Sequence, residues 1–312
     1  MSTTTRPTGR SAIHASGDPA ATLSRLLDAE LNWGPIASGG YISHLAMGLV
    51  AAERLGASAE QLERHFHVTT SGSFLIPRER PQEVIELSTE IERRGIDAVV
   101  TERLPSMVGH PGAQFLHAAI RLDLAIDSQH PGQVANALIN WSDDAVPPEP
   151  DLAGHGDASF AEVMALVANG DRDHALDHLH GSDDLLDQIS DWVTAVHDDP
   201  GDFGTLHYVT GTRAVRAVVG YLDDENRRTI ERRLAQALVG FTDRFGFASP
   251  AGIDELDRRR ATPVPDWDEL GSLAVRSQDP HIIKLTYACR LEHERDGDPL
   301  HQWVAARQTG VA

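Results

Sequence analysis

Two side chains that can do chemistry lie three residues apart, His281 and Lys284, within the largely apolar segment 279–289. Asp279 can cap a helix, and proline is well tolerated at the first helical position, which Pro280 would take. Residues three apart share a helix face, so the imidazole and the amine should point the same way. The apolar neighbours predict a buried helix, where a lysine must lose its charge or gain a partner. This segment is therefore the first candidate for a reactive or metal-binding site.

Three further histidines lie in similar apolar surroundings: His44 within 41–50, His117 within 114–120 and His207 within 205–212. A helix that is apolar nearly all round is typical of a protein centre, and a buried imidazole needs a partner for each ring nitrogen. One shared metal ion would satisfy all four histidines. The alternative is a hydrogen-bonded core residue, which is the commoner role of a single helical histidine.

Most other histidines sit among charged residues or turns, which predicts that they are solvated; these are His65, His67, His130, His155, His174, His178, His180, His197, His293 and His301. His14, in the N-terminal segment, is a weaker candidate ligand. His197 and Asp198 form the dipeptide that metal-dependent phosphohydrolases use on helical folds. Pro200 and Gly201 follow at once and favour a helix end instead.

The sequence carries no phosphate-binding glycine-rich loop, dinucleotide fingerprint or nucleophile elbow. Gly211, between Thr210 and Thr212, lacks the context of such a motif and is predicted to be a close helix contact.

Acidic residues dominate the charge of the chain. Its 47 aspartates and glutamates against 27 lysines and arginines give a net charge of -20 over 312 residues. Such a surface repels phosphate backbones and anionic lipid, which argues against nucleic acid or a membrane as partner. No stretch reaches the roughly 20 apolar residues that span a bilayer. The single cysteine, Cys289, excludes a disulfide framework within the chain and suits a cytoplasmic protein, with homo-oligomer formation left open.

Helical periodicity dominates and strand patterns are scarce, so we predict an all-α fold with the active centre among central helices. Residues 1–19 are expected to form a flexible arm and 20–312 a helical domain, with loops near 145–157 and 248–265. The segment 83–92 fits neither period and could be a strand or a helix. Helices are predicted near 20–31, 40–55, 58–69, 113–127, 132–143, 159–168, 171–180, 183–198, 203–221, 223–246, 266–277, 279–296 and 298–308.

The four histidine segments, taken in order, resemble signatures of the questin oxidase-like proteins. The matching stretches are 39–47 followed by 54–58, then 115–121, 206–211 and 279–286. The resemblance extends from about residue 20 to 308. It implies an α-helical fold and an enzyme that uses O2 to open aromatic, polyketide-derived rings by Baeyer–Villiger-like or dioxygenase chemistry.

The resemblance also implies a non-haem Fe(II) centre held by His44, His117, His207, His281 and a carboxylated Lys284, with Lys284 and His207 as the leading catalytic candidates. Burial lowers the pKa of a lysine toward neutrality, and a neutral amine can add carbon dioxide to form a carbamate. Imidazoles with an anionic oxygen suit ferrous iron. Whether one or two oxygen atoms enter the product, and whether NADPH or another reductant takes part, stays open.

A pocket for an electron-rich aromatic substrate is expected to be lined by Trp33, Tyr41, Tyr208 and Tyr287. Candidate partners for the free imidazole nitrogens are Arg121, Asp123 and Thr210. Two other functions stay open beside the oxygenase: a phosphohydrolase around His197 and Asp198, and a non-catalytic helical binding protein.

Overall fold

The computed structural model describes residues 17–72, 74–142, 156–171, 175–179, 183–199, 201–246 and 249–312. These ranges contain fifteen α-helices, a few short 3₁₀ turns and isolated bridges, and no strand. The predicted all-α fold is confirmed. Most of the proposed arm (1–16) and of the loop near 145–157 (143–155) lies outside the described residues.

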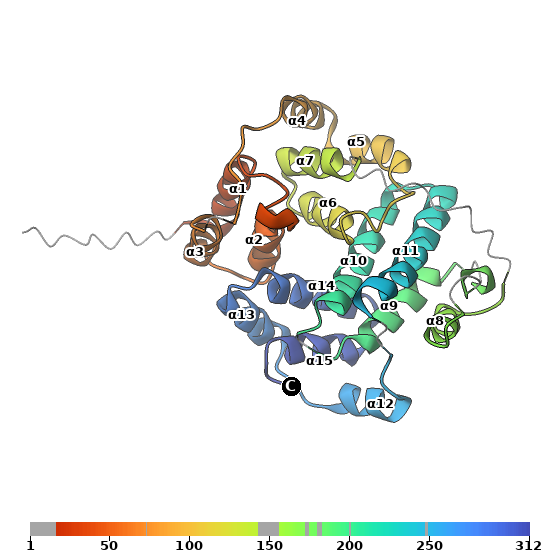
Figure 1. The fold of residues 1–312 in the computed structure, drawn as a ribbon. Helices are drawn as coiled ribbons and strands as arrows, with labels where there is room; N and C mark the ends of the chain where they lie inside the picture. Colours follow the sequence, from red (N-terminus) through yellow and green to blue (C-terminus); the bar gives the residue numbers. More distant parts are fainter. Residues whose placement is uncertain are drawn as a thin grey trace, which may run out of the picture.

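Four helices form a closed ring at the centre: α2 (Leu45–Arg54), α6 (His117–Asp127), α10 (Phe203–Val218) and α14 (Pro280–Asp296). Helices α2 and α10 each pack against both α6 and α14 (Figure 1). Every residue of α14 from 283 to 289 is buried, as expected for a helix with neighbours on all sides. Each helix of this ring begins at or next to one of the four candidate histidines, or carries one in its first two turns.

The other helices surround this ring (Figure 1). Beside α2 lie α1 (Pro19–Glu30) and α3 (Ala59–Thr70). On the outer side of α6 are α4 (Gln82–Arg94), α5 (Ile96–Arg103) and α7 (Pro131–Ser142). Beside α10 lie α9 (Leu185–Val196) and α11 (Asp224–Phe245), and α8 (Phe160–Ala168) packs on these two. Beside α14 lie α13 (Trp267–Ser277) and α15 (Pro299–Gln308), and α12 (Ile253–Ala261) packs on α15.

The predicted loop at 248–265 is wrong in part, because its middle forms α12. Acidic residues occupy the first turn of this helix and arginines the last, which favours the helix dipole. Glu255 accepts hydrogen bonds from both Arg258 and Arg259 across a turn. Arg259 is buried and lies over the Trp303 ring at 4.5 Å, which anchors α12 to α15.

Other segments also differ from the prediction. Helix α5 was not expected, and the described part of the helix expected at 171–180 forms only the 3₁₀ turn Ala175–His178. The ambiguous segment 83–92 is helical and belongs to α4, whose Val84, Leu87 and Ile91 are buried at helical spacing. Residues 41–44 are not helical and Gly40 ends a short 3₁₀ turn (Ser38–Gly40), so α2 begins only at Leu45, after a loop in which the backbone of Ile36 pairs with that of Ile42. No helix in the described ranges has the length and apolar character needed to cross a lipid bilayer.

A buried charge cluster ties the outer half of α10 to α14. Glu292 is buried and lies 3.2 Å from both Arg216 Nε and Arg295 Nε. Arg213 lies 3.7 Å from Glu292 and 4.0 Å from Asp123 on α6. Burial, opposed by Arg213, raises the pKa of Asp123 to about 7. The folded protein therefore holds a proton on Asp123 that the unfolded chain releases near pH 4.

The variant Asp123→Asn tests how much unfolding free energy the protein loses when the buried Asp123 carboxyl must ionise. Because the folded pKa lies above the unfolded one, wild-type stability should fall as the pH rises from about 4 to about 7 and stay low above that. Relative to wild type, the variant should gain up to about 3 kcal/mol of unfolding free energy between pH 5 and pH 8. Urea denaturation at both pH values measures the difference. An equal pH dependence in the two proteins would contradict the buried-proton account.

Candidate metal centre

The structure brings the four predicted histidines together where the N-terminal ends of the ring helices meet. His44 directly precedes α2, His117 opens α6, His207 starts the second turn of α10 and His281 is the second residue of α14. Ring centroids are 4.8 Å apart for His44 and His117, 4.5 Å for His117 and His207, and 4.5 Å for His44 and His281. Four segments distant along the chain thus present imidazoles to one small volume.

Three of these rings direct their Nε2 atoms at one another. His117 Nε2 lies 2.6 Å from His44 Nε2 and 3.1 Å from His207 Nε2. One ligand atom from each of His44, His117 and His207 lies within 4.8 Å of the others. Two nitrogens that bind one ion at about 2.1 Å are about 3.0 Å apart at a right angle. The His117–His207 spacing already fits that geometry, and the His44–His117 spacing would need to widen slightly.

Hydrogen bonds on the far side of the rings decide which nitrogens carry protons. Nδ1 of His117 lies 2.6 Å from the Gln114 carbonyl oxygen, and Nδ1 of His207 lies 2.6 Å from that of Phe203. A carbonyl oxygen only accepts, so each Nδ1 carries the hydrogen and each Nε2 presents a lone pair. The two lone pairs face each other at 3.1 Å. His44 could donate to one of them, but not to both, so a bound cation satisfies the group better than hydrogen bonding can.

The electrostatics keep these imidazoles neutral, as ligands must be. Burial and the neighbouring Lys284 hold the pKa of His44, His117 and His207 well below the usual imidazole range. Burial also lowers the pKa of His281, although a hydrogen bond to Asp279 opposes the shift. The positive ends of four helix dipoles add to this effect, and they favour any anion that enters the site.

Lys284 and His281 lie beside these three histidines on α14, and the ring of His281 is 4.5 Å from that of His44 and 5.5 Å from that of His207. The predicted cap is confirmed: Asp279 accepts a hydrogen bond from the His281 backbone N–H at 2.8 Å, and α14 begins at Pro280. His281 Nδ1 lies 3.2 Å from Asp279 Oδ1. Neither His281 Nε2 nor Lys284 Nζ has a hydrogen-bond partner among the described residues. Lys284 is 2 % exposed, and burial lowers its pKa to about 7.

These observations fit a metal with nitrogen ligands and one hard oxygen ligand. Unprotonated Nε2 atoms converge. The imidazoles of His117, His207 and His281 each have an oxygen acceptor at the outer ring nitrogen. The buried Lys284 amine lies close enough to lower the pKa of all four histidines. Such outer hydrogen bonds are the usual support of metal-bound imidazoles. The residues present therefore fit the iron site that the resemblance implies.

A strained turn positions His117. Gln114, Phe115 and Leu116 have φ values of 53°, 56° and 67°, the left-handed region that costs a non-glycine residue roughly 1–2 kcal/mol. This turn places the Gln114 carbonyl under His117 Nδ1. It is held by Gln114 Nε2 donating to the Asn140 carbonyl and by Arg121 donating to Gln114 Oε1. Consecutive strained residues beside a cluster of ligands are typical of a functional site.

Gly211 packs against this turn from α10, which confirms its predicted role as a close contact. A Cβ at position 211 would lie 2.6 Å from the Cβ of Leu116. The glycine therefore lets α10 approach the left-handed turn, and this approach brings His207 next to His117.

For His117, His207 and His281 the candidate imidazole partners are wrong, because two backbone carbonyls and Asp279 take those places. Arg121 supports Gln114, Asp123 lies beside Arg213, and Thr210 donates to the Leu206 carbonyl within α10. A backbone carbonyl carries no residue-type signal, so sequence patterns do not reveal it.

Of the expected pocket residues, only Tyr208 packs near the histidines. Its ring is 6.1 Å from Phe115, which lies 5.1 Å from His207. Tyr41 is 65 % exposed and packs on Phe74, Tyr287 donates to Asp127, and Trp33 pairs through its backbone with Pro77.

Phenylalanines, which the sequence patterns did not indicate, surround the site instead. Phe203 lies 4.2 Å from His207 and 5.1 Å from His281, and at 45 % exposure it forms an outer cover. Phe115 contacts His207 on another side and Phe241 at 4.6 Å. Phe203 lies at the start of a helix and Phe115 in the strained turn, so neither belongs to a run of apolar residues at helical spacing that would have indicated it.

Several other histidines predicted to be solvated are in fact buried: His65, His130, His197 and His301. His65 and His301 lie within helices, and His130 and His197 lie directly beside a helix end, so the charge of sequence neighbours does not indicate whether these side chains face the core. His67 and His178 are exposed and His293 is half-buried, whereas His14, His155, His174 and His180 lie outside the described residues.

The side chains of His197 and Asp198 have different partners in the structure. His197 Nδ1 lies 2.8 Å from Thr205 Oγ1 and its Nε2 lies 3.3 Å from Gln308 Oε1. Asp198 is exposed and pairs with Arg259 at 3.1 Å. This geometry gives no support to a phosphohydrolase centre at the pair.

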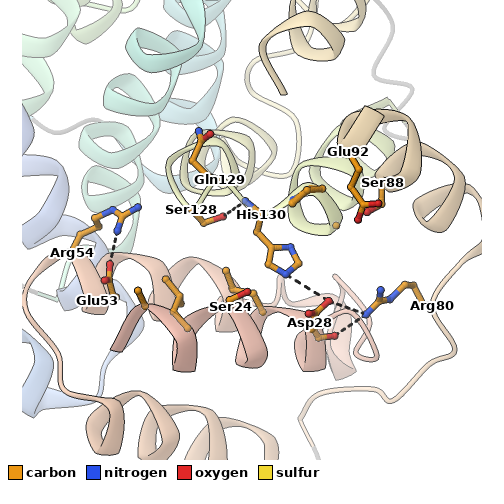
Figure 2. Close-up of a pocket in the computed structure, with 15 residues that line it drawn as sticks. Ser24, Asp28, Glu53, Arg54, Arg80, Ser88, Glu92, Ser128, Gln129 and His130 are labelled. Carbon is orange, nitrogen blue, oxygen red and sulfur yellow. Dashed lines mark hydrogen bonds and ion pairs between the residues drawn. The ribbon is translucent and has the colours of Figure 1, made fainter. Parts of the chain in front are cut away.

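A polar cavity of about 410 Å³ lies away from the histidines, between α1, α4 and the start of α7 (Figure 2). Its charged groups pair with one another: Asp28 lies 3.6 Å from both His130 and Arg80, and Glu53 contacts Arg54.

The role of Gly211 can be tested against a second helical glycine, Gly240, where a Cβ would meet nothing within 4 Å. Gly211→Ala should lower the unfolding free energy by about 1–3 kcal/mol, because Leu116 must move. Gly240→Ala should raise it by about 0.5–1 kcal/mol through helix propensity. Thermal and urea unfolding measure both. Equal effects of the two substitutions would show that the α10–turn contact is not tight.

No protein-family model and no curated protein matches this chain. The resemblance to questin oxidase-like proteins therefore stays a prediction, and the geometry of the four histidines and Lys284 is the basis for assigning a function.

Proposed function

We propose that the protein is a non-haem Fe(II)-dependent oxygenase that uses O2 on an aromatic, polyketide-derived small molecule. His44, His117, His207 and His281 would hold the iron, together with a carboxylated Lys284. The observation that carries the proposal is the buried Lys284 amine, without a hydrogen-bond partner among the described residues, beside three imidazoles whose Nε2 atoms converge. A fourth imidazole, that of His281, has its ring centroid 4.5 Å from that of His44. A purely structural histidine cluster gains nothing from a buried lysine in this state.

Once carboxylated, Lys284 would supply a negative charge, which four neutral imidazoles lack. With a pKa of about 7, a substantial fraction of the amine is neutral at physiological pH. Its lone pair can attack carbon dioxide, forming a C–N bond and releasing one proton to solvent. The resulting carbamate oxygen is a hard anionic donor that suits ferrous iron. The helix N-termini around the site stabilise this new anion.

When bound, the iron would supply redox chemistry with O2 and orient the substrate. The chain itself fixes the ligand geometry. The Gln114 and Phe203 carbonyls hold two imidazoles in the Nδ1–H form, and Asp279 holds a third. Phe203 covers the site against bulk water, and Phe115 gives it an apolar wall. A dry, preorganised site strengthens each electrostatic interaction inside it.

Metal analysis of protein purified without oxygen tests the ligand set. Wild type should carry about one iron per chain, whereas His207→Ala and Lys284→Met should each lose most of it while staying folded. The exposed His67→Ala serves as control and should retain the wild-type content. Stoichiometric iron in both site variants would end the proposal.

Oxygen uptake then tests the reaction class. With iron-loaded wild type, hydroxylated naphthalenes and hydroxyquinones should each be offered at equal concentration, with and without NADPH. At least one should raise O2 consumption well above the substrate-free rate, and Lys284→Met should abolish that increase. Substrate-independent uptake alone, equal in the two proteins, would contradict oxygenase function.

Carbon dioxide dependence tests the role of Lys284. Iron uptake by metal-free protein should be several-fold lower in CO2-depleted buffer and restored by bicarbonate, because the carbamate oxygen would be missing. With ¹³C-bicarbonate, the wild type should give a carbamate NMR signal that Lys284→Met lacks. Uptake that is independent of bicarbonate, with no such signal, would show that the lysine is not carboxylated.

A further inference from the structure

We propose that Arg121 is a positioning residue of the histidine centre. Its guanidinium ties the loop that leads to His44 to the turn that leads to His117, and so sets the spacing of their Nε2 atoms. Arg121 lies on α6, one turn after His117, and is 5 % exposed. The proposal rests on the proposed function for the identity of the metal, but the positioning role can be tested in metal-free protein.

One arm of the guanidinium reaches the strained turn before His117. Arg121 Nη1 donates to Gln114 Oε1 at 3.2 Å, and Gln114 Nε2 donates to the Asn140 carbonyl at 3.0 Å. The side-chain amide of Gln114 is thus held at both ends, by α6 and by α7. The backbone carbonyl of Gln114 accepts the hydrogen of His117 Nδ1 at 2.6 Å. The Arg121 contact therefore fixes the residue that orients the His117 ring.

The other arm reaches the loop before His44. Arg121 Nη2 donates to the Pro35 carbonyl at 3.4 Å, and the Ser43 backbone N–H donates to the same oxygen at 2.8 Å. A carbonyl oxygen has two lone pairs, so it can accept both hydrogen bonds. Ser43 directly precedes His44, whose Nε2 lies 2.6 Å from His117 Nε2. The Pro35 carbonyl thus joins Arg121 to the backbone beside His44.

An arginine suits this junction for a geometric reason. His44 and His117 are 73 residues apart in the chain, so local structure cannot set the distance between their rings. A planar guanidinium donates in several fixed directions, which lets one side chain hold two segments at once. A lysine ammonium is a point charge on a flexible stem and fixes neither direction.

A buried acid lies within electrostatic reach of this buried guanidinium. Glu30 of α1 is buried, and Gln133 Nε2 donates to its Oε2 at 2.9 Å. Burial raises the pKa of Glu30, and the Gln133 hydrogen bond and the positive charge of Arg121 oppose the rise. This attraction offsets part of the cost of burying both charges. Arg121→Lys keeps the positive charge opposite Glu30 and should therefore stay folded.

The first measurement is NMR of metal-free protein labelled with ¹³C and ¹⁵N in its histidines. Wild type should show His117 protonated at Nδ1 and a nuclear Overhauser effect between ring protons of His44 and His117. Arg121→Met should lose most of this effect, because both segments are released. Arg121→Lys should lose it as well, since the charge remains but the two fixed donors do not.

Arg259→Met is the matched control. Arg259 is also 5 % exposed, and its partners include Glu255, Asp198 and the Trp303 ring. Its replacement should loosen α12 and leave the ring signals of His44 and His117 as in wild type.

The second measurement is a titration with Co(II), which takes the place of ferrous iron and is followed by its visible absorption. Both Arg121 variants should bind Co(II) at least about tenfold more weakly than wild type, as expected when a support of metal ligands is removed. Arg259→Met should change the affinity less than about twofold.

Wild-type ring contacts and Co(II) affinity in folded Arg121→Met would overturn the proposal. If Arg121→Met does not fold, the same result in Arg121→Lys would overturn it, as would an equal loss in Arg259→Met.

The two proposals fail in different ways. Wild type that takes up neither Co(II) nor iron would refute the metal centre, while the ring contacts in metal-free protein still decide the role of Arg121. Wild-type metal affinity and ring contacts in both Arg121 variants would refute the positioning role and leave the metal centre standing.

Discussion

The whole arrangement depends on two unprotonated imidazole nitrogens that face each other in a buried site. His117 Nε2 and His207 Nε2 are 3.1 Å apart, and backbone carbonyls fix the protons of both rings on the opposite nitrogens. Two lone pairs at this distance repel each other, and no water-like dielectric weakens the repulsion. The contact costs stability in the absence of a cation, and a cation between the rings would turn the repulsion into binding energy. The ring of α2, α6, α10 and α14 serves to bring these nitrogens together.

A bound cation would also account for several features that cost the folded protein stability. The left-handed turn at 114–116 stores strain, Lys284 is buried without a hydrogen-bond partner among the described residues, and four helix N-termini meet at one point. Each would be selected against in a purely structural core. Together they fit the proposed site, which would hold a cation through neutral nitrogens and accept an added anion. Gly211 of α10 packs closely against Leu116 of the strained turn. The packing of α10 against this turn therefore sets the position of His117.

The sequence predicted the parts of this site that have local signals. Asp279 and Pro280 mark the start of α14, so the shared face of His281 and Lys284 could be foreseen. The apolar surroundings of His44, His117 and His207 likewise indicated central positions. The strained turn could not be foreseen, since Gln114, Phe115 and Leu116 are ordinary residues held left-handed only by tertiary contacts. Helix α12 was missed because its stability comes from arginine pairing and from packing on Trp303. The burial of His65 and His197 escaped prediction for a related reason, as sequence neighbours do not show which helix face packs inward.

X-ray absorption spectroscopy at the iron edge, on protein loaded with ferrous iron without oxygen, tests the central claim most directly. We expect the multiple-scattering pattern of about four imidazoles together with one light oxygen donor, and a loss of imidazole scattering in His207→Ala. Iron whose spectrum carries no imidazole scattering, or whose spectrum is the same in His207→Ala, would mean that the metal binds elsewhere and that the converging histidines do not hold it.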